Sequence, residues 1–219
     1  MRSSTPKNVG PGAHIAARLI KLPVEVANRW LLDGVVTGRE HLPCDGPYII
    51  TANHLSLIDP ILVSLAAGRL VRFLALDELF GRSRVLDELM LYFGAVPLSR
   101  ERPPYGALQQ AMRLLEDGQI MGIFPEGARS RYWGERPIKR GAAWLSLATG
   151  APIVPCAVTG TESTLSLAEP RFRIPSVRLS LHPAIEPEPY CDMEDPVGAM
   201  MDDWVSVIEA QLGHWVCEE

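Results

Sequence analysis

The chain has 219 residues, 47% of them hydrophobic, a length that allows one sizeable packed domain and makes two marginal. This hydrophobic content argues against a disordered chain, and a net charge of −5 argues against a nucleic-acid binder, because neutralising phosphates requires a basic surface. The four cysteines are scattered without a CxxC pair, which favours free thiols in a reducing cytoplasmic compartment and predicts no metal site.

The first 34 residues divide into two parts. Residues 1–12 contain two prolines and two glycines and predict a flexible tail. In residues 13–34 apolar side chains recur at helical spacing between basic residues, which predicts an amphipathic helical segment kinked at Pro23. This segment either packs on the domain or contacts a membrane surface, for which Trp30 is suited. No apolar run approaches the roughly 18 residues of a membrane-spanning helix, and the pattern does not match that of a secretory signal.

Residues 35–186 alternate between strand and helix patterns, which predicts a single α/β domain whose mostly parallel central sheet is flanked by helices. Residues 69–140 hold twelve Lys or Arg against nine acidic residues. This basic excess is compatible with an anionic substrate, with lipid headgroups or with a solvated surface. The expected strands are 48–52, 71–76, 94–98, 119–124, 153–158 and 177–181, and the expected helices are 60–67, 105–117 and 141–149.

The last part of the chain is acidic. Residues 186–219 contain ten acidic residues and no Lys or Arg. We therefore expect 187–219 to form an acidic C-terminal segment, largely exposed to solvent, with one helix near 204–212.

A first motif, NHLSLID, occupies residues 53–59, after a predicted strand and before a predicted helix, where α/β sheets carry their chemistry. Ser56 and Asp59 have the spacing of a capping box, with Ser56 as the cap. The His54 ring can then turn toward the Asp59 carboxylate, which would fix its tautomer and leave Nε2 free to take a proton from a hydroxyl group. The alternative is that Asp59 only caps the helix and His54 is a surface residue.

Two further strands end in arginines. GAVPLSR ends at Arg100, and FPEGARSR places Glu126, Gly127, Arg129 and Arg131 after a strand. Arginine suits bidentate recognition of phosphate, and glycine allows a backbone to approach a ligand closely. Each arginine alone is more simply explained as an exposed, solvated charge. Three strand ends that carry His/Asp, Arg and Glu/Arg in turn nevertheless favour a shared site.

NHLSLID, GAVPLSR, FPEGARS and APIVPCAV, in this order, resemble the four blocks of the glycerolipid acyltransferases, and most closely the lysophosphatidic acid acyltransferases. The resemblance runs from Val36 to about Pro183. It implies transfer of a fatty acyl group from acyl-CoA or acyl carrier protein to the hydroxyl of a lysophospholipid, most directly 1-acyl-sn-glycerol-3-phosphate, which gives phosphatidic acid. It also implies an enzyme on the cytoplasmic face of a membrane, bound peripherally, that needs no metal or cofactor.

The resemblance assigns roles to the motif residues. His54 would be the general base and Asp59 its orienting partner. The acceptor would be bound by Arg100, Glu126, Gly127 and Arg129. The two arginines would contact its phosphate. The supporting residues would be Asn53, Ser56, Pro125, Ser130 and Pro155.

Two positions depart from the family pattern. Ser99 stands where an acidic residue is usual, and Ala128 where threonine is usual. The departures leave open a different alcohol or amine acceptor, such as a lyso-ornithine lipid, a glycolipid or a specialised metabolite. A non-catalytic lipid- or acyl-carrier-binding protein is the alternative of another class, but such a protein has no use for an oriented base.

Overall fold

The computed structural model describes residues 36–76, 96–98, 105–163, 165–167, 170–171 and 177–217. The predicted amphipathic segment, the N-terminal tail and Arg100 lie outside these residues. In the described part of the chain, no helix is both long and apolar enough to cross a bilayer.

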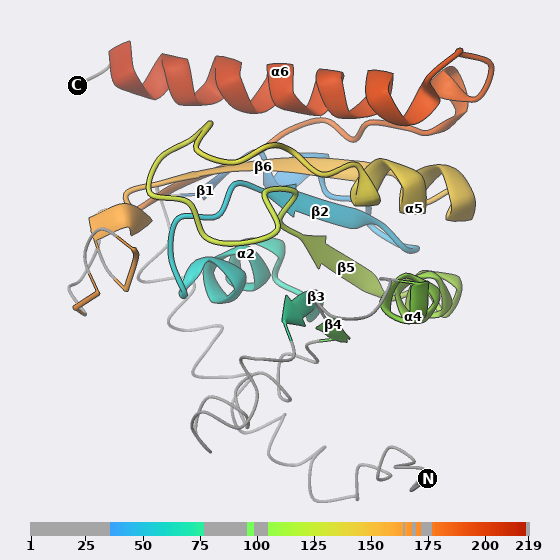
Figure 1. The fold of residues 1–219 in the computed structure, drawn as a ribbon, viewed down its shortest axis with the longest axis horizontal. Helices are drawn as coiled ribbons and strands as arrows, with labels where there is room; N and C mark the ends of the chain where they lie inside the picture. The colour runs from blue at the N-terminus through green and yellow to red at the C-terminus, as the bar shows by residue number, and fades with distance from the viewer. Residues whose placement is uncertain are drawn as a thin grey trace, which may run out of the picture.

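A twisted seven-stranded sheet forms the centre of the molecule (Figure 1), with strands in the order β1-β7-β6-β2-β5-β3-β4. Neighbouring strands pair in parallel, except for β6 and β7, which are antiparallel. The predicted α/β domain with a mostly parallel sheet is therefore confirmed. The strands are β1 (Val36–Thr37), β2 (Ile49–Ala52), β3 (Val71–Leu76), β4 (Val96–Leu98), β5 (Ile120–Ile123), β6 (Ile153–Thr159) and β7 (Arg178–Leu181).

Helices cover both faces of this sheet (Figure 1), and two of them end at a glycine in the left-handed conformation. Gly68 and Gly150 close two of them with φ of 62° and 73°, a conformation that glycine adopts without steric cost. The α-helices are α2 (Asp59–Ala67), α4 (Tyr105–Glu116), α5 (Gly141–Thr149) and α6 (Pro196–Cys217), and the 3₁₀ helices are η1 (Arg39–His41), η3 (Thr161–Ser163) and η4 (Glu188–Tyr190).

The central strand β2 is buried along its whole length, as expected for a largely apolar strand covered on both faces. Ile49 packs into a core with side chains of α4, α5 and α6, whereas its neighbour Ile50 packs into a second core with Val63 of α2. Because successive side chains of a strand point to opposite faces, both layers are anchored on the strand that leads into the NHLSLID loop.

The acidic C-terminal segment differs from the expectation of a largely solvated end. Its helix α6 has 22 residues and lies along one face of the sheet (Figure 1). Met200, Trp204 and Ile208 are fully buried in the core, while the acidic Asp202, Asp203 and other carboxylates remain exposed. The apolar residues at intervals of four define a packed face that the charge count alone did not reveal.

Candidate active site

The NHLSLID loop follows β2, and the loops after β5 and β6 reach the same edge of the sheet (Figure 1). Within the loop, His54 Nδ1 lies 2.9 Å from Asp59 Oδ2. The Asp59 side chain is fully buried, whereas 14% of the His54 side chain is exposed. The predicted contact is confirmed, and it leaves the second ring nitrogen, Nε2, as the one not bound to the carboxylate.

Asp59 Oδ2 also organises the backbone of the loop. It accepts hydrogen bonds from the backbone N–H groups of Leu55 and Ser56, each at 2.7 Å. One carboxylate oxygen therefore fixes both the imidazole ring and the two residues that follow it. Such charge-assisted bonds are stronger than bonds between neutral groups.

The predicted capping box is only half formed. The Asp59 carboxylate reaches back to the Ser56 N–H, as such a box requires. However, α2 begins at Asp59 with Ile58 as its N-cap, so Asp59 is not at the third helical position, and the Ser56 hydroxyl accepts the Ile58 N–H at 3.4 Å. The arrangement therefore differs from a simple helix cap, because the Asp59 carboxylate bonds to the loop backbone and to the His54 ring.

The FPEG turn after β5 holds His54 from the opposite side. Glu126 Oε2 accepts the His54 backbone N–H at 2.6 Å, and the His54 carbonyl accepts the Ser130 N–H at 2.8 Å. The His54 ring stacks on Phe124 with a centroid distance of 4.0 Å, and Phe124 stacks on Phe73 at 5.3 Å. His54 is therefore fixed at its ring, its amide and its carbonyl.

The Glu126 carboxyl lies in an unusual environment. The residue is 2% exposed, and its Oε1 has no hydrogen-bond partner within the described structure. Burial raises the pKa of Glu126 to about 7, although the bond from the His54 N–H acts in the opposite direction. The turn itself closes through a hydrogen bond from the Gly127 N–H to the Phe124 carbonyl, and Gly127 has a φ of 73°.

Asn53 ties the loop to β6. Its side-chain amide donates to the Val158 carbonyl and its side-chain oxygen accepts the Val158 N–H, both at 2.8 Å. Pro155 of the fourth block is buried in β6 opposite Thr51 of β2. The neighbouring Cys156 thiol is also fully buried, and burial raises its pKa to about 12.

Arg129 contacts the segment that follows η3. Its Nη1 donates to the Leu165 carbonyl at 3.1 Å, and the same carbonyl accepts the Leu57 N–H at 3.3 Å. Leu165 has a φ of 44°, a left-handed conformation that is uncommon for leucine. Partial burial lowers the pKa of the Arg129 guanidinium. The Leu165 carbonyl thus links Leu57 of the first motif to Arg129 of the third.

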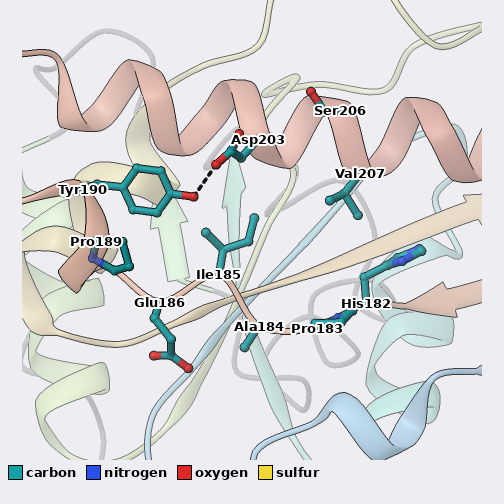
Figure 2. Close-up of a pocket in the computed structure, with 10 residues that line it drawn as sticks. All are labelled: His182, Pro183, Ala184, Ile185, Glu186, Pro189, Tyr190, Asp203, Ser206 and Val207. Atoms are coloured by element: carbon teal, nitrogen blue, oxygen red, sulfur yellow. Dashed lines mark hydrogen bonds between the residues drawn. The ribbon is translucent and has the colours of Figure 1, made fainter. Parts of the chain in front are cut away.

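A separate hollow of about 570 Å³ lies between α6 and the segment 182–190. Figure 2 shows the Tyr190 hydroxyl directed at Asp203, to which it donates a hydrogen bond of 2.5 Å. None of the motif residues lines this hollow. We therefore place the candidate active site at the loops after β2 and β5 and not here.

The position of His54 next to Asp59 follows from the local sequence, but most of its other contacts do not. The roles of Glu126, Phe124 and Asn53 depend on partners 72, 70 and 105 residues away in the chain. The periodicity of apolar residues in a sequence does not reveal contacts between residues so far apart. The order of the strands, which sets β2 between β5 and β6, is the signal that would have found them.

Comparisons with known proteins agree on one family. The family model described as Acyltransferase matches residues 34–159. The 1-acyl-sn-glycerol-3-phosphate acyltransferase of Bacillus subtilis is 32% identical over 131 residues, covering 58% of this chain and 63% of the relative. The chloroplastic 1-acyl-sn-glycerol-3-phosphate acyltransferase BAT2 of Brassica napus is 34% identical over 129 residues, covering 58% and 37%. The match thus spans less than two thirds of either curated relative.

A solved structure shares the fold. It is the crystal structure of the 1-acyl-sn-glycerophosphate (LPA) acyltransferase PlsC from Thermotoga maritima, with a TM-score of 0.67 and 23% sequence identity. The alignment covers 93% of this chain and 84% of that one.

Proposed function

The chain belongs to the acyltransferase family, and on that premise we propose that it transfers a fatty acyl group from acyl-CoA or acyl carrier protein to the hydroxyl of a lysophospholipid. The acceptor we propose is 1-acyl-sn-glycerol-3-phosphate, which gives phosphatidic acid, because curated relatives carry the name of that activity. The observation that carries the proposal is the 2.9 Å contact between His54 Nδ1 and the buried Asp59 carboxylate.

The contact supports general-base catalysis. Asp59 holds the proton on Nδ1, so Nε2 is available to accept the proton of the acceptor hydroxyl. The alkoxide oxygen then attacks the thioester carbonyl, and the tetrahedral intermediate collapses by breaking the carbon–sulfur bond. The thiolate leaves and takes up the proton from His54, which returns the imidazole to its starting state. Asp59 stabilises the imidazolium that exists between these two steps.

The environment of the nearby thiol and hydroxyl groups favours direct transfer over a covalent acyl-enzyme. Cys156 and Ser130 are both fully buried, and the raised pKa of Cys156 keeps its thiol protonated. A thiol in this state is a poor nucleophile, so the acceptor hydroxyl is the group that His54 activates.

Arg129, together with Arg100, is proposed to bind the phosphate of the acceptor. Arg129 uses Nη1 for the Leu165 carbonyl, and its other guanidinium N–H groups remain suited to a phosphate oxygen. The resemblance assigns Glu126 to acceptor binding, and that assignment stays a prediction. The contacts of Glu126 and Asn53 support a further role for both, in which they fix the backbone and position of His54.

Ser99, at a position where the family usually has an acidic residue, favours a test of other acceptors. A panel containing lysophosphatidic acid, a lyso-ornithine lipid and a lysoglycolipid discriminates between them. Exclusive use of lysophosphatidic acid would exclude the other alcohol or amine acceptors.

We place the reaction at a membrane surface, on the cytoplasmic side, because the acceptor is a lipid and residues 13–34 combine apolar and basic side chains. The wild-type chain should sediment with anionic vesicles. A variant in which Ile15, Leu19 and Trp30 are replaced by serine should remain in the supernatant. Equal retention of both proteins would argue against this surface contact.

The decisive experiment follows thiol release from palmitoyl-CoA with and without lysophosphatidic acid. Acceptor-dependent release by the wild type should fall about 10²–10⁴-fold in His54→Ala, because the general base is lost. His214→Ala, on the exposed side of α6, is the matched control and should retain full turnover. Undiminished turnover in folded His54→Ala would refute the mechanism. A wild type that transfers no acyl group from either donor to any acceptor of the panel would refute the function.

A further inference from the structure

The segment that runs from the FPEG turn to α5 is strongly basic. Residues 124–140 contain five Lys or Arg and two Glu, in a chain whose net charge is −5. Four of these five cations contact acceptors within the protein. Arg131 pairs with Glu135, Arg140 pairs with Asp195, Arg136 Nε donates to the Arg129 carbonyl, and Arg129 donates to the Leu165 carbonyl.

Lys139 is the exception. Among the described residues, its ammonium group has no ion pair or hydrogen bond, although its backbone N–H donates to the Pro125 carbonyl at 2.8 Å. The side chain lies across Gly127, so a methyl group on that residue would stand only 2.6 Å from Lys139 Cε and 2.9 Å from Cδ. The absence of a side chain at Gly127 is what gives the lysine this path.

This path places a positive charge at the turn that holds the base. Gly127 follows Glu126, whose carboxylate binds the His54 N–H, and the turn also supports the His54 ring through Phe124. Lys139 lies two residues before α5, and the positive end of that helix dipole adds to the same field. A cation anchored at its backbone and free at its tip is suited to bind an anionic group of a substrate.

We propose that Lys139 is a substrate-binding residue of this site and that it binds a phosphate group. This inference rests on the proposed function, which supplies two substrates with phosphates: the phosphate monoester of the lysophospholipid acceptor and the phosphates of the CoA donor. In either case the ammonium binds as a point charge and works with Arg129, whose planar group recognises phosphate oxygens from a fixed direction.

Equilibrium titration tests the proposal without requiring turnover. Lys139→Gln, Lys139→Arg and the control Arg140→Gln are each titrated with lysophosphatidic acid, monoacylglycerol of the same chain length, CoA and pantetheine. Loss of one charged hydrogen bond should weaken binding of one phosphate ligand about 10- to 100-fold in Lys139→Gln. Lys139→Arg should largely restore it, and Arg140→Gln should resemble the wild type because its guanidinium is paired with Asp195.

The ligands separate the two sources of phosphate. Weaker binding of lysophosphatidic acid, with monoacylglycerol and CoA unchanged, identifies the acceptor phosphate. Weaker binding of CoA, with pantetheine unchanged, identifies the donor phosphates. Equal affinities in the wild type and Lys139→Gln, or a wild type that binds no phosphate ligand better than its phosphate-free analogue, overturn the proposal. An enzyme that binds these ligands but transfers no acyl group refutes the proposed function alone.

Discussion

Replacing Asp59 by Asn and by Ala should separate its proposed catalytic role from its structural role. Oδ2 accepts three hydrogen bonds, from His54 Nδ1 and from the N–H groups of Leu55 and Ser56, whereas the buried Oδ1 has no partner within the described structure. An asparagine can place its carbonyl oxygen at the triple acceptor position and its NH₂ group at the position of Oδ1. Alanine supplies no acceptor at all.

The magnitudes follow from these contacts. Asparagine converts three charge-assisted bonds into neutral ones, at a cost of up to about 1 kcal/mol each, so the free energy of unfolding should fall by about 1–3 kcal/mol. Alanine leaves the two buried backbone N–H groups unpaired and breaks the contact to the ring, which should cost about 3–6 kcal/mol. Turnover by Asp59→Asn should nevertheless fall about 10²–10⁴-fold, because a neutral amide does not stabilise the imidazolium.

Urea unfolding followed by circular dichroism gives the stabilities, and thiol release from palmitoyl-CoA gives the rates. The folded His54→Ala variant is the control, since it removes the proposed base but keeps both backbone contacts of Asp59. Turnover by Asp59→Asn within tenfold of the wild type would refute the role assigned to the carboxylate. Equal destabilisation by Asn and Ala would refute the role assigned to the loop amides.

Three further substitutions test other parts of the structure. Gly122→Ala should reduce turnover and lower the free energy of unfolding by about 1–3 kcal/mol, because the new methyl group meets the Phe73 ring, on which the Phe124 ring next to His54 stacks. Gly106→Ala, where the added methyl group meets no other atom, is the control, and equal effects of the two substitutions would contradict this explanation. Glu126→Gln should change the pH dependence of stability: a carboxyl whose pKa rises from 4.5 to about 7 stabilises the fold below pH 4.5, and this contribution, at most about 3 kcal/mol, disappears as the pH rises through 7. Between pH 4.5 and pH 8 the wild type should therefore lose more free energy of unfolding than Glu126→Gln, as measured by urea unfolding. An equal change in both proteins would contradict the raised pKa of Glu126. Trp204→Ala should cost about 3–5 kcal/mol by urea unfolding, since the indole is fully buried, and a cost below about 1 kcal/mol would mean that α6 does not belong to the core.

Local sequence signals predicted the parts of the fold that depend on neighbouring residues. The range of α5 was predicted at both ends, because its apolar run is closed by Gly150, and β3 was predicted at both ends by its apolar run. The contact of His54 with Asp59 was predictable for the same reason, as five residues of loop can bring the two side chains together.

Long-range contacts were not predictable in this way. The stacking of Phe124 on His54 and the binding of Leu165 by Arg129 arise only after strands far apart in sequence are placed side by side. The two-residue strand β1 is too short to show a period, and the burial of α6 was obscured by the acidic residues on its exposed side. In each case a tertiary contact decided what composition and periodicity left undetermined.

The pairing of Asn53 with Val158 has a consequence for how the molecule assembles. The two residues are 105 positions apart, so the loop that carries His54 closes against a strand that is synthesised long after it. A nascent chain or a fragment that stops before β6 contains NHLSLID and FPEGARS but lacks the partner that holds Asn53. Catalytic competence should therefore arise late and together with the complete sheet, and mixing a fragment of residues 1–150 with one of residues 151–219 should restore turnover only where the two fragments associate.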